Sequence, residues 1–213
     1  MKIALFGATG HIGHGILDEA LARGYEVVAI VRDPSRLAER NDKLTVVTGD
    51  VARPASWLDA VRGVDAVVAS LSARRDGTPD GIPASARTLL DSLPRAGVKR
   101  LLWVGGAGTL ETAPGVRVID DPHFPAAWKA EATAQGQALE VFRASPADVD
   151  WTYVSPAALI EDGTRSGAYR LGGDQLLVDA HGVSRITIAD YAAALLDRIE
   201  QRDATRRRIT VAY

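Results

Sequence analysis

Cysteine is absent from the 213 residues of the chain. This excludes disulfides, thiolate nucleophiles and metal sites built on cysteine, and it is compatible with a reducing compartment. Long hydrophobic runs are also missing. The apolar residues 1–6 are interrupted by Gly7 and Gly10, which leaves too short a stretch for the core of a signal peptide. No run approaches the roughly 20 apolar residues that span a membrane. We therefore expect a cytoplasmic protein without a membrane partner.

A surplus of positive charge is lacking as well. The formal net charge is −2 and the isoelectric point is near 6.1, so nucleic acid is not an expected partner. Hydrophobic residues make up 46% and charged residues 24% of the chain, as in ordinary globular proteins. The length fits one domain, residues 1–213. We expect a monomer or homodimer that binds a small molecule.

Short apolar segments alternate with helical patterns through the first two thirds of the chain. The predicted strands are residues 2–6, 26–31, 44–48, 65–69, 100–104 and 151–154. The predicted helical segments between them are residues 12–21, a turn opened by Pro54, residues 82–96 and residues 125–144. Strands that are apolar on both faces and separated by helices indicate right-handed βαβ units. The sequence therefore predicts an α/β protein with a Rossmann-type doubly wound parallel sheet and helices on both faces.

The last third of the chain is less regular. Five glycines between residues 161 and 185 favour loops and short hairpins, followed by a helix over residues 189–200 and a strand over residues 208–211. Residues 155–188 follow the sixth strand, so they are expected to lie near the carboxyl ends of the strands, where ligands bind in such sheets. We predict that they form a small, irregular lobe on the substrate side.

The segment GATGHIG, residues 7–13, joins the first strand to the first helix. Gly7 suits a tight turn, Gly10 lets the backbone approach a diphosphate, and Gly13 allows close packing of helix against strand. The start of the helix adds free N–H groups and the positive end of the helix dipole. The alternative is a plain strand–helix turn. The predicted phosphate-binding residues are Gly7, Thr9, Gly10, His11, Ile12 and Gly13.

Two arginines follow the second strand, where dinucleotide sites contact the adenosine ribose. Arg32 and Arg36 suit a 2′-phosphate, to which Thr9 could add a hydroxyl, whereas Asp33 leaves NADH as the other candidate. NADPH is therefore the expected cofactor. After the third strand, Asp50 and Val51 are predicted to lie beside the adenine. Asp50 could accept from the adenine amine or cap the short helix that begins near Pro54.

Small residues follow the fourth and fifth strands. They leave room for a nicotinamide ring against the backbone, although loops without a ligand would have the same composition. Pro156, after the sixth strand, is expected on the same side. The predicted residues around the nicotinamide are Ser70, Leu71, Ser72, Gly105, Gly106, Ala107 and Pro156.

Together these motifs resemble a known family. GATGHIG, GYEVVAIVRDPSRL at residues 24–37, GDV at residues 49–51, SGAY at residues 166–169 and SRITIADYAAAL at residues 184–195 are similar to the atypical short-chain dehydrogenases/reductases. They most resemble the flavin reductase and biliverdin-IXβ reductase-like branch, with its bacterial NADH-flavin reductases. The resemblance covers nearly the whole chain. It implies NADPH binding, hydride transfer from the nicotinamide, and flat conjugated acceptors such as FMN, FAD, riboflavin or quinone-like compounds.

The chain departs from these relatives in its proton donors. No tyrosine has a lysine four residues later, as the family's Tyr-x-x-x-Lys pair requires, and Lys129 follows Trp128 near the expected position. The histidine of the related animal reductases is absent from the segment after the sixth strand. His123, in the loop after the fifth strand, could donate a proton. The candidate catalytic residues are therefore His123 and Lys129.

Three functions remain open. Hydride transfer to a flavin needs positioning more than a dedicated acid, so a flavin reductase is compatible with the missing tyrosine. A non-catalytic NADP(H)-sensing regulator is the alternative, and a sugar-nucleotide epimerase or dehydratase is the third interpretation. Trp128 could stack on a flat acceptor ring. His11 and His14 have no further ligand at a suitable spacing, so no metal site is predicted.

Overall fold

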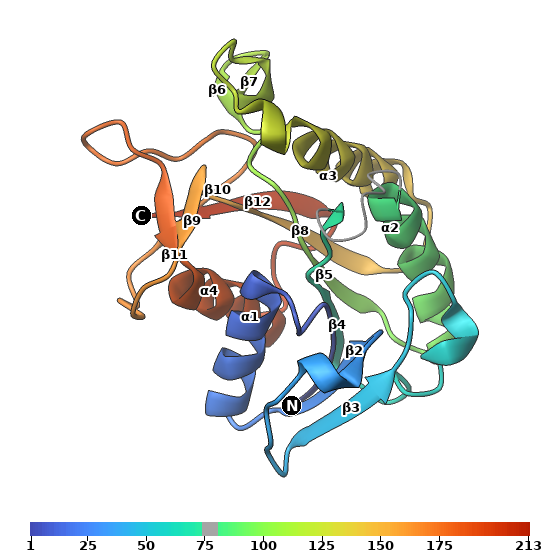
Figure 1. The fold of residues 1–213 in the computed structure, drawn as a ribbon. Coiled ribbons are helices and arrows are strands. Elements are labelled where there is room, and N and C mark those ends of the chain that lie inside the picture. The colour runs from blue at the N-terminus through green and yellow to red at the C-terminus, as the bar shows by residue number, and fades with distance from the viewer. Residues whose placement is uncertain (74–80) are drawn as a thin grey trace.

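A computed structural model describes residues 1–73 and 81–213. Its centre is an eight-stranded sheet in the order β10-β12-β8-β5-β4-β1-β2-β3 (Figure 1). All neighbours pair in parallel except the edge strand β10, which is antiparallel to β12. The strands are β1 (Lys2–Phe6), β2 (Glu26–Val31), β3 (Leu44–Thr48), β4 (Ala66–Ala69), β5 (Arg100–Val104), β8 (Asp150–Pro156), β10 (Arg170–Gly172) and β12 (Arg207–Ala212).

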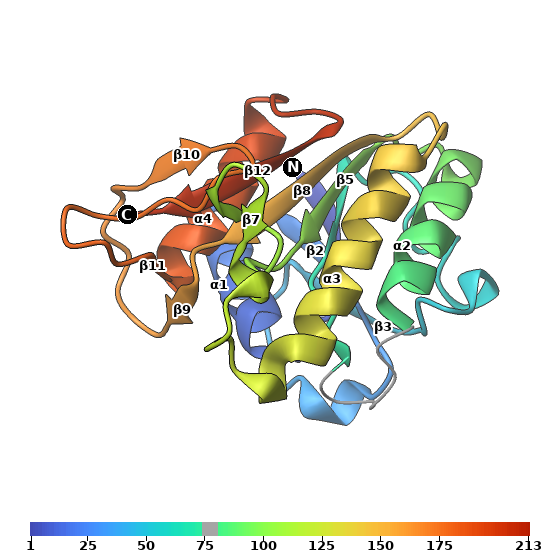
Figure 2. The same ribbon diagram turned by 90° about the horizontal axis from the view of Figure 1, so that it is seen from above.

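Helices cover both faces of this sheet, so the predicted doubly wound architecture is confirmed. α1 (His11–Ala22) and α4 (Ile188–Glu200) pack together on one face, and α2 (Gly81–Ser92) and α3 (Ala126–Ala144) pack together on the other (Figures 1 and 2). The strand order reverses between β1 and β4, because the chain adds β2 and β3 on one side of β1 and later strands on the other. Doubly wound sheets bind ligands at such a switch point.

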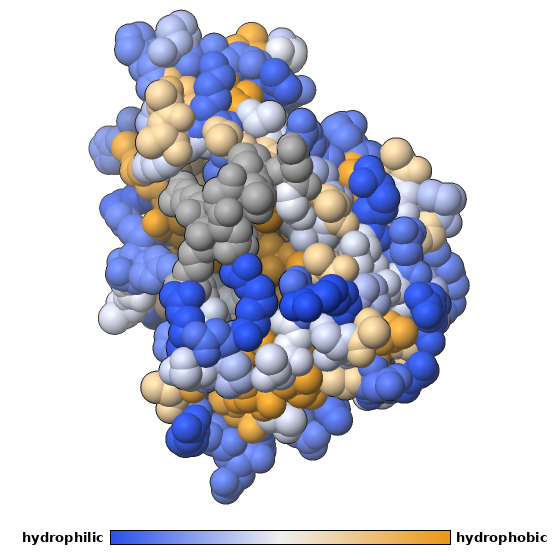
Figure 3. Space-filling view, turned by 45° about the vertical axis from the view of Figure 1, so that its right-hand side comes forward, coloured by the Kyte–Doolittle hydropathy of each residue, from blue (hydrophilic) through white to orange (hydrophobic). Residues whose placement is uncertain are grey.

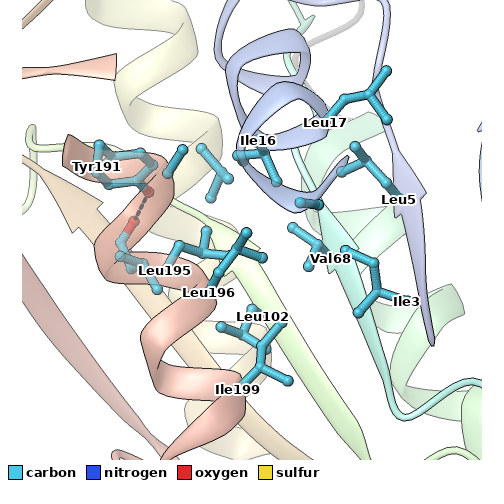
Figure 4. Packing of buried hydrophobic residues seen from close by; sticks show 14 of the residues in the cluster. Ile3, Leu5, Ile16, Leu17, Val68, Leu102, Tyr191, Leu195, Leu196 and Ile199 are labelled. Carbon is cyan, nitrogen blue, oxygen red and sulfur yellow. Dashed lines mark hydrogen bonds between the residues drawn. The ribbon is translucent and has the colours of Figure 1, made fainter. Parts of the chain in front are cut away.

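The two faces bury different side chains because successive residues of a strand point to opposite sides. Figure 4 shows the aliphatic face, where Ile3 and Leu5 of β1 contact the side of α1 and α4. There Tyr191 of α4 donates its hydroxyl to the carbonyl of Val154, 2.6 Å away. The opposite face is rich in aromatic rings, such as the edge-to-face pair of Phe6 and Trp57 with centroids 5.1 Å apart.

One helical prediction is confirmed, and another is corrected by proline chemistry. The helical turn expected after Pro54 is a short 3₁₀ helix, η2 (Pro54–Ser56), followed by turns that lead to β4. The helix expected over residues 82–96 is α-helical only to Ser92 and continues as the 3₁₀ helix η4 (Leu93–Ala96). Pro94 has no N–H to donate to the preceding turn, so the α-helical ladder cannot continue through it.

Elements outside the main sheet differ most from the prediction. β9 (Leu159–Glu161) pairs in parallel with β11 (Arg185–Thr187), whereas local hairpins were expected over residues 161–185. An unpredicted hairpin, β6 (Glu111–Ala113) and β7 (Val116–Arg117), projects beyond α3 (Figure 1). A final 3₁₀ turn η5 (Val118–Asp120) leads toward α3, and η1 (Pro34–Arg36) follows β2. Within the described ranges, no helix combines the length and apolarity needed to cross a bilayer.

Candidate functional site

A cleft of about 1120 Å³ lies along the carboxyl ends of the strands, on both sides of the switch between β1 and β4. Residues that follow β1, β2, β3, β4, β5 and β8 line it, together with the first turns of α1 and α2 and one side of α3. Pockets for small molecules commonly measure about 300–1,000 Å³, so this cleft accommodates a large cofactor and a second molecule. Figure 3 shows that hydrophilic residues cover most of this face of the molecule and that apolar residues are visible within its central hollow.

The loop after β1 has glycine at three positions for different structural reasons. Gly7 has φ +84°, and a Cβ there would lie 1.9 Å from the carbonyl oxygen of Ser70. A Cβ at Gly13 would lie 2.0 Å from the carbonyl oxygen of Gly7. At Gly10 the nearest atom, the same Gly7 oxygen, would be 3.2 Å away. The fold itself therefore requires Gly7 and Gly13, whereas Gly10 keeps open a space that borders the cleft.

The amino end of α1 is directed at this space. Gly10 is its N-cap and carries no side-chain cap, and the first hydrogen bond to the cap runs from His14 N–H to Gly10 O at 2.8 Å. The N–H groups of His11, Ile12 and Gly13 precede that bond, so they have no acceptor within the helix. Gly7, Thr9, Gly10, His11 and Ile12 line the cleft, whereas Gly13 lies behind the loop and packs it against the helix. This cradle fits a diphosphate.

The end of the cleft beside β2 and β3 contains the predicted arginine. Arg32 lines the cleft and also an adjoining cavity of about 470 Å³, which it shares with Asp50 and Arg53. Arg36 does not line the cleft, because it ends the exposed η1 turn. Asp33 caps that turn and accepts from the hydroxyl of Ser35 at 2.6 Å and from its N–H at 3.0 Å. These hydrogen bonds hold the pKa of Asp33 below its usual value.

Asp50 and Val51 also line this end. The carboxylate of Asp50 accepts from Ala52 N–H at 3.0 Å and lies 3.4 Å from the guanidinium of Arg53. The N-cap of η2 is Arg53, so the alternative in which Asp50 caps the helix near Pro54 is wrong. A side chain three residues ahead of the cap closes its own Asx turn instead of reaching the helix N–H groups.

The other half of the cleft contains the small residues predicted around a nicotinamide: Ser70, Leu71, Ser72, Gly105, Gly106, Ala107 and Pro156. The reason for a glycine at position 105 differs from the expected one. A Cβ there would lie 2.0 Å from the ring of Tyr153. The room at this glycine is thus occupied by the protein's own ring. Tyr153 also accepts from Gly106 N–H at 3.2 Å, which fixes the loop after β5.

Sequence reasoning missed two polar residues of α3 that line this half. Gln135 donates to Leu71 O at 3.0 Å and to Glu131 Oε1 at 3.2 Å, and it accepts from the indole N–H of Trp103 at 2.9 Å. Glu131 Oε2 accepts from Ala73 N–H at 2.8 Å. The available signal was Gln135 itself, a polar residue within the apolar stripe of a helix, which indicates a buried hydrogen-bonded role.

The outer end of the cleft is formed by residues 118–128 and 157–160. His123 lies here, but its side chain is 96% exposed and its Nδ1 is 3.2 Å from Asp121 Oδ1. Hydrogen bonds from the N–H and the ring of His123 lower the pKa of Asp121. Trp128 lines the cleft and is 43% exposed. Lys129 is exposed and does not line the cleft. Residues on one side of a helix are three or four positions apart, and on α3 the cleft-facing residues are Trp128, Glu131, Ala132 and Gln135.

The histidines of α1 lie in different surroundings. His11 lines the cleft, and its Nε2 is 3.1 Å from Asp162 Oδ1, a residue outside the lining. His14 groups with Asp18 and Glu39, and their ligand atoms lie within 4.8 Å of one another at the surface. None of these three residues lines the cleft. Exposed acidic groups of this kind are common without an ion, so no metal is assigned.

Residues 7–198 match the family described as NAD(P)H-binding. The uncharacterized protein YwnB of Bacillus subtilis is 37% identical over 99% of this chain and 98% of its own length. A Bacteroides thetaiotaomicron structure, provisionally named an epimerase, has a TM-score of 0.90 and 38% identity, covering 100% of this chain and 96% of that one. A Streptococcus pneumoniae structure, provisionally named an NADH-flavin reductase, has a TM-score of 0.83 and 32% identity, covering 100% and 99%.

The family match covers residues 7–198, which include the glycine loop at the start of α1, the strands from β2 to β11, and α3. Geometry and similarity thus agree on the kind of molecule the cleft accommodates. The chain belongs to the NAD(P)H-binding family of atypical short-chain dehydrogenases/reductases, a family of oxidoreductases.

Proposed function

We propose that the protein is an NADPH-dependent reductase that transfers hydride to a flavin or a similar flat, conjugated acceptor. The observation that carries the proposal is the cradle at Gly10, where the amino end of α1 meets space that the fold itself leaves open. Arg32 lies at one end of the same cleft and Trp128 at the other. A dinucleotide held at the cradle would extend in both directions.

The lining residues divide into three groups in this proposal. The backbone N–H groups of His11 and Ile12 hold the diphosphate beside Thr9 and Gly10, and Gly7 and Gly13 shape the loop. Arg32 pairs with the 2′-phosphate, while Asp50 and Val51 border the adenine. Ser70, Leu71, Ser72, Gly106, Ala107 and Pro156 border the nicotinamide.

The tyrosines favour an acceptor that needs no dedicated acid. All five tyrosine hydroxyls contact other groups of the protein, and none of the five residues lines the described cleft. Tyr153 donates to Gln135 O at 2.9 Å, and burial raises its pKa far above the usual value. The other four contact acceptors of their own: Tyr25 with Glu200, Tyr169 with Asp197, Tyr191 with Val154 O and Tyr213 with Asp190. Carbonyl reduction requires an acid for the developing alkoxide.

Bound NADPH would supply a hydride, which at N5 of a flavin would give NADP⁺ and the reduced flavin anion; any further proton on the flavin would come from water. The chain's own contribution is orientation. Phe124, Trp128 and Leu159 offer apolar surface at the outer end of the cleft, and the indole can stack on a flat ring. His123 lines this end of the cleft and is exposed, so it could exchange a proton with solvent. Lys129 lies outside the lining.

Cofactor binding tests the proposal at Arg32. Arg32→Ala is expected to weaken NADPH binding about tenfold or more and to change NADH binding less than about twofold, as for loss of a charged hydrogen bond. Arg36→Ala is the matched control and should change neither, because Arg36 lies outside the cleft. Turnover is tested separately, by following the absorbance of NADPH over time with FMN in excess. Equal effects of Arg32→Ala on both cofactors would overturn the assignment of the 2′-phosphate.

The engaged tyrosines favour one further candidate, a protein that senses NADP(H) without turnover. Such a regulator would bind NADPH and NADP⁺ with different affinities and leave NADPH unoxidised with FMN, riboflavin and quinones alike. An epimerase is less compatible with the site, since it too would use an acid–base tyrosine in the cleft. The acceptor assay therefore separates the candidates.

A further inference from the structure

The side of α3 that faces the cleft carries one carboxylate, Glu131, for which the proposed function gives no role. Ala132 and Gln135 lie beside it on the same side of the helix. A Cβ at Gly108 would meet Ala132 Cβ at 2.8 Å, and one at Gly106 would meet Gln135 Cβ at 3.3 Å. This side of α3 therefore abuts the loop after β5, which borders the nicotinamide half of the cleft.

The carboxylate of Glu131 also reaches the chain after β4. Its Oε2 accepts from Ala73 N–H at 2.8 Å, and its Oε1 accepts from Gln135 Nε2 at 3.2 Å. Gln135 is only 5% exposed and is itself fixed by Trp103 and Leu71. Glu131 is thus held between the ends of β4 and β5, just beyond the switch point.

Two hydrogen bonds leave acceptor capacity on this group. An ionised carboxylate offers about four lone-pair sites, and each oxygen of Glu131 receives one hydrogen bond among the contacts above. The side chain is half-buried and lines the cleft. Carboxylates recognise ribose hydroxyls in dinucleotide sites, because a vicinal diol offers two O–H donors at short spacing.

We propose that Glu131 positions the nicotinamide ribose by accepting hydrogen bonds from its hydroxyl groups. This inference rests on the proposed function. The carboxylate would fix the sugar, and through it the face of the nicotinamide that meets the acceptor. Glu131 moves no proton in this role; it is a positioning residue.

Binding of two probes tests the role. NADPH contains the nicotinamide riboside, whereas adenosine 2′,5′-bisphosphate contains only the adenosine half. For Glu131→Ala we expect NADPH to bind about tenfold to a hundredfold more weakly, the range for a hydrogen bond to a charged group. The bisphosphate should bind as to the wild type, and the fluorescence enhancement of bound NADPH should fall. Glu131→Gln, which keeps an acceptor for Ala73 N–H, should restore the loop but recover NADPH affinity only in part.

Each outcome separates the inference from its alternatives. If Glu131→Ala weakens both probes equally, Glu131 only holds the loop after β4 and the inference fails. Unchanged NADPH affinity in a folded Glu131→Ala protein would overturn it too. Glu140→Ala, on the exposed side of the same helix, is the matched control and should bind both probes normally. If the wild type binds neither probe, the proposed function itself fails.

Discussion

The two ends of the cleft are built in different ways. The phosphate cradle consists of backbone at the ends of β1 and β4, and at Gly7 and Gly13 a Cβ would lie about 2 Å from a main-chain oxygen. The outer end consists of loop side chains such as His123, which is 96% exposed and contacts Asp121 two residues away. Core packing fixes the first end, while the second depends on a few exposed side chains.

This difference separates the part of the cleft that the fold itself fixes from the part that exposed side chains determine. The cradle cannot change without disturbing the central strands, so the site for the dinucleotide is part of the fold. The outer residues can be replaced with little effect on the core, because loops carry them. In the proposed reductase, we therefore expect the choice of acceptor to depend on Phe124, Trp128 and their neighbours.

The largest predicted effect breaks the cradle while sparing the other end. Gly7→Ala adds a methyl group 1.9 Å from Ser70 O at a positive φ, so we expect a loss of about 3 kcal/mol or more in the free energy of unfolding. Gly10→Ala meets one atom at 3.2 Å and has φ −87°, so its cost should stay within about 1 kcal/mol. Urea unfolding of both variants measures the difference. Equal destabilisation would refute the distinct causes given for the two glycines.

The next effect concerns the contact between α4 and residues 155–188, the lobe beside the outer end of the cleft. Asp190 is buried, and burial alone would raise its pKa; hydrogen bonds from Tyr213, Ser166 and Gly167 outweigh this and lower the pKa to about 2. Because the folded-state pKa lies below the ordinary 3.8, ionised Asp190 stabilises the fold above that pH. The stabilisation, about 2 kcal/mol, disappears as the pH falls from near 4 toward 2.

Asp190→Asn provides the measurement. The variant should be less stable than the wild type at neutral pH, and the gap between them should narrow as the pH falls through this window. Asp59→Asn is the control, since Asp59 is exposed and pairs with Arg62 on the surface. A gap that stays constant with pH would show that the charge of Asp190 does not stabilise the lobe.

The smallest effect sharpens the comparison from the acceptor side. Trp128→Ala should raise the KM for FMN about threefold to tenfold, the value of an aromatic stacking contact, and leave the Kd for NADPH unchanged. Lys129→Ala, its neighbour outside the cleft, should alter neither constant. If Trp128→Ala weakened NADPH instead, the indole would belong to the cofactor end and the division of the cleft would be wrong.

Buried apolar runs made the main sheet predictable. Residues 2–6, 26–31, 44–48 and 100–104 were expected as strands and have the same bounds in the structure. Their residues are nearly all apolar because both faces of the sheet are buried, and this composition can be recognised within each segment alone. The pairing of β9 with β11 joins segments more than twenty residues apart, and nothing in either segment specifies the partner.

The site was predictable to the extent that backbone geometry defines it. Glycine spacing located the cradle, and strand ends located most of the lining residues. The reason for a glycine at position 105 was not predictable, because it is the ring of Tyr153 on β8, a strand that pairs with β5 but comes much later in the chain. Glu131 and Arg36 show the same limit: which side of a helix or turn faces a cleft depends on how the elements pack.

Calorimetric titration of NADPH into the wild type and Gly10→Ala tests the central claim most directly, namely that the amino end of α1 holds the cofactor's diphosphate. We predict saturable one-to-one binding to the wild type and none, or at least tenfold weaker binding, to a Gly10→Ala protein with normal thermal stability. Wild-type affinity in the folded variant, or no binding by the wild type, would contradict the claim.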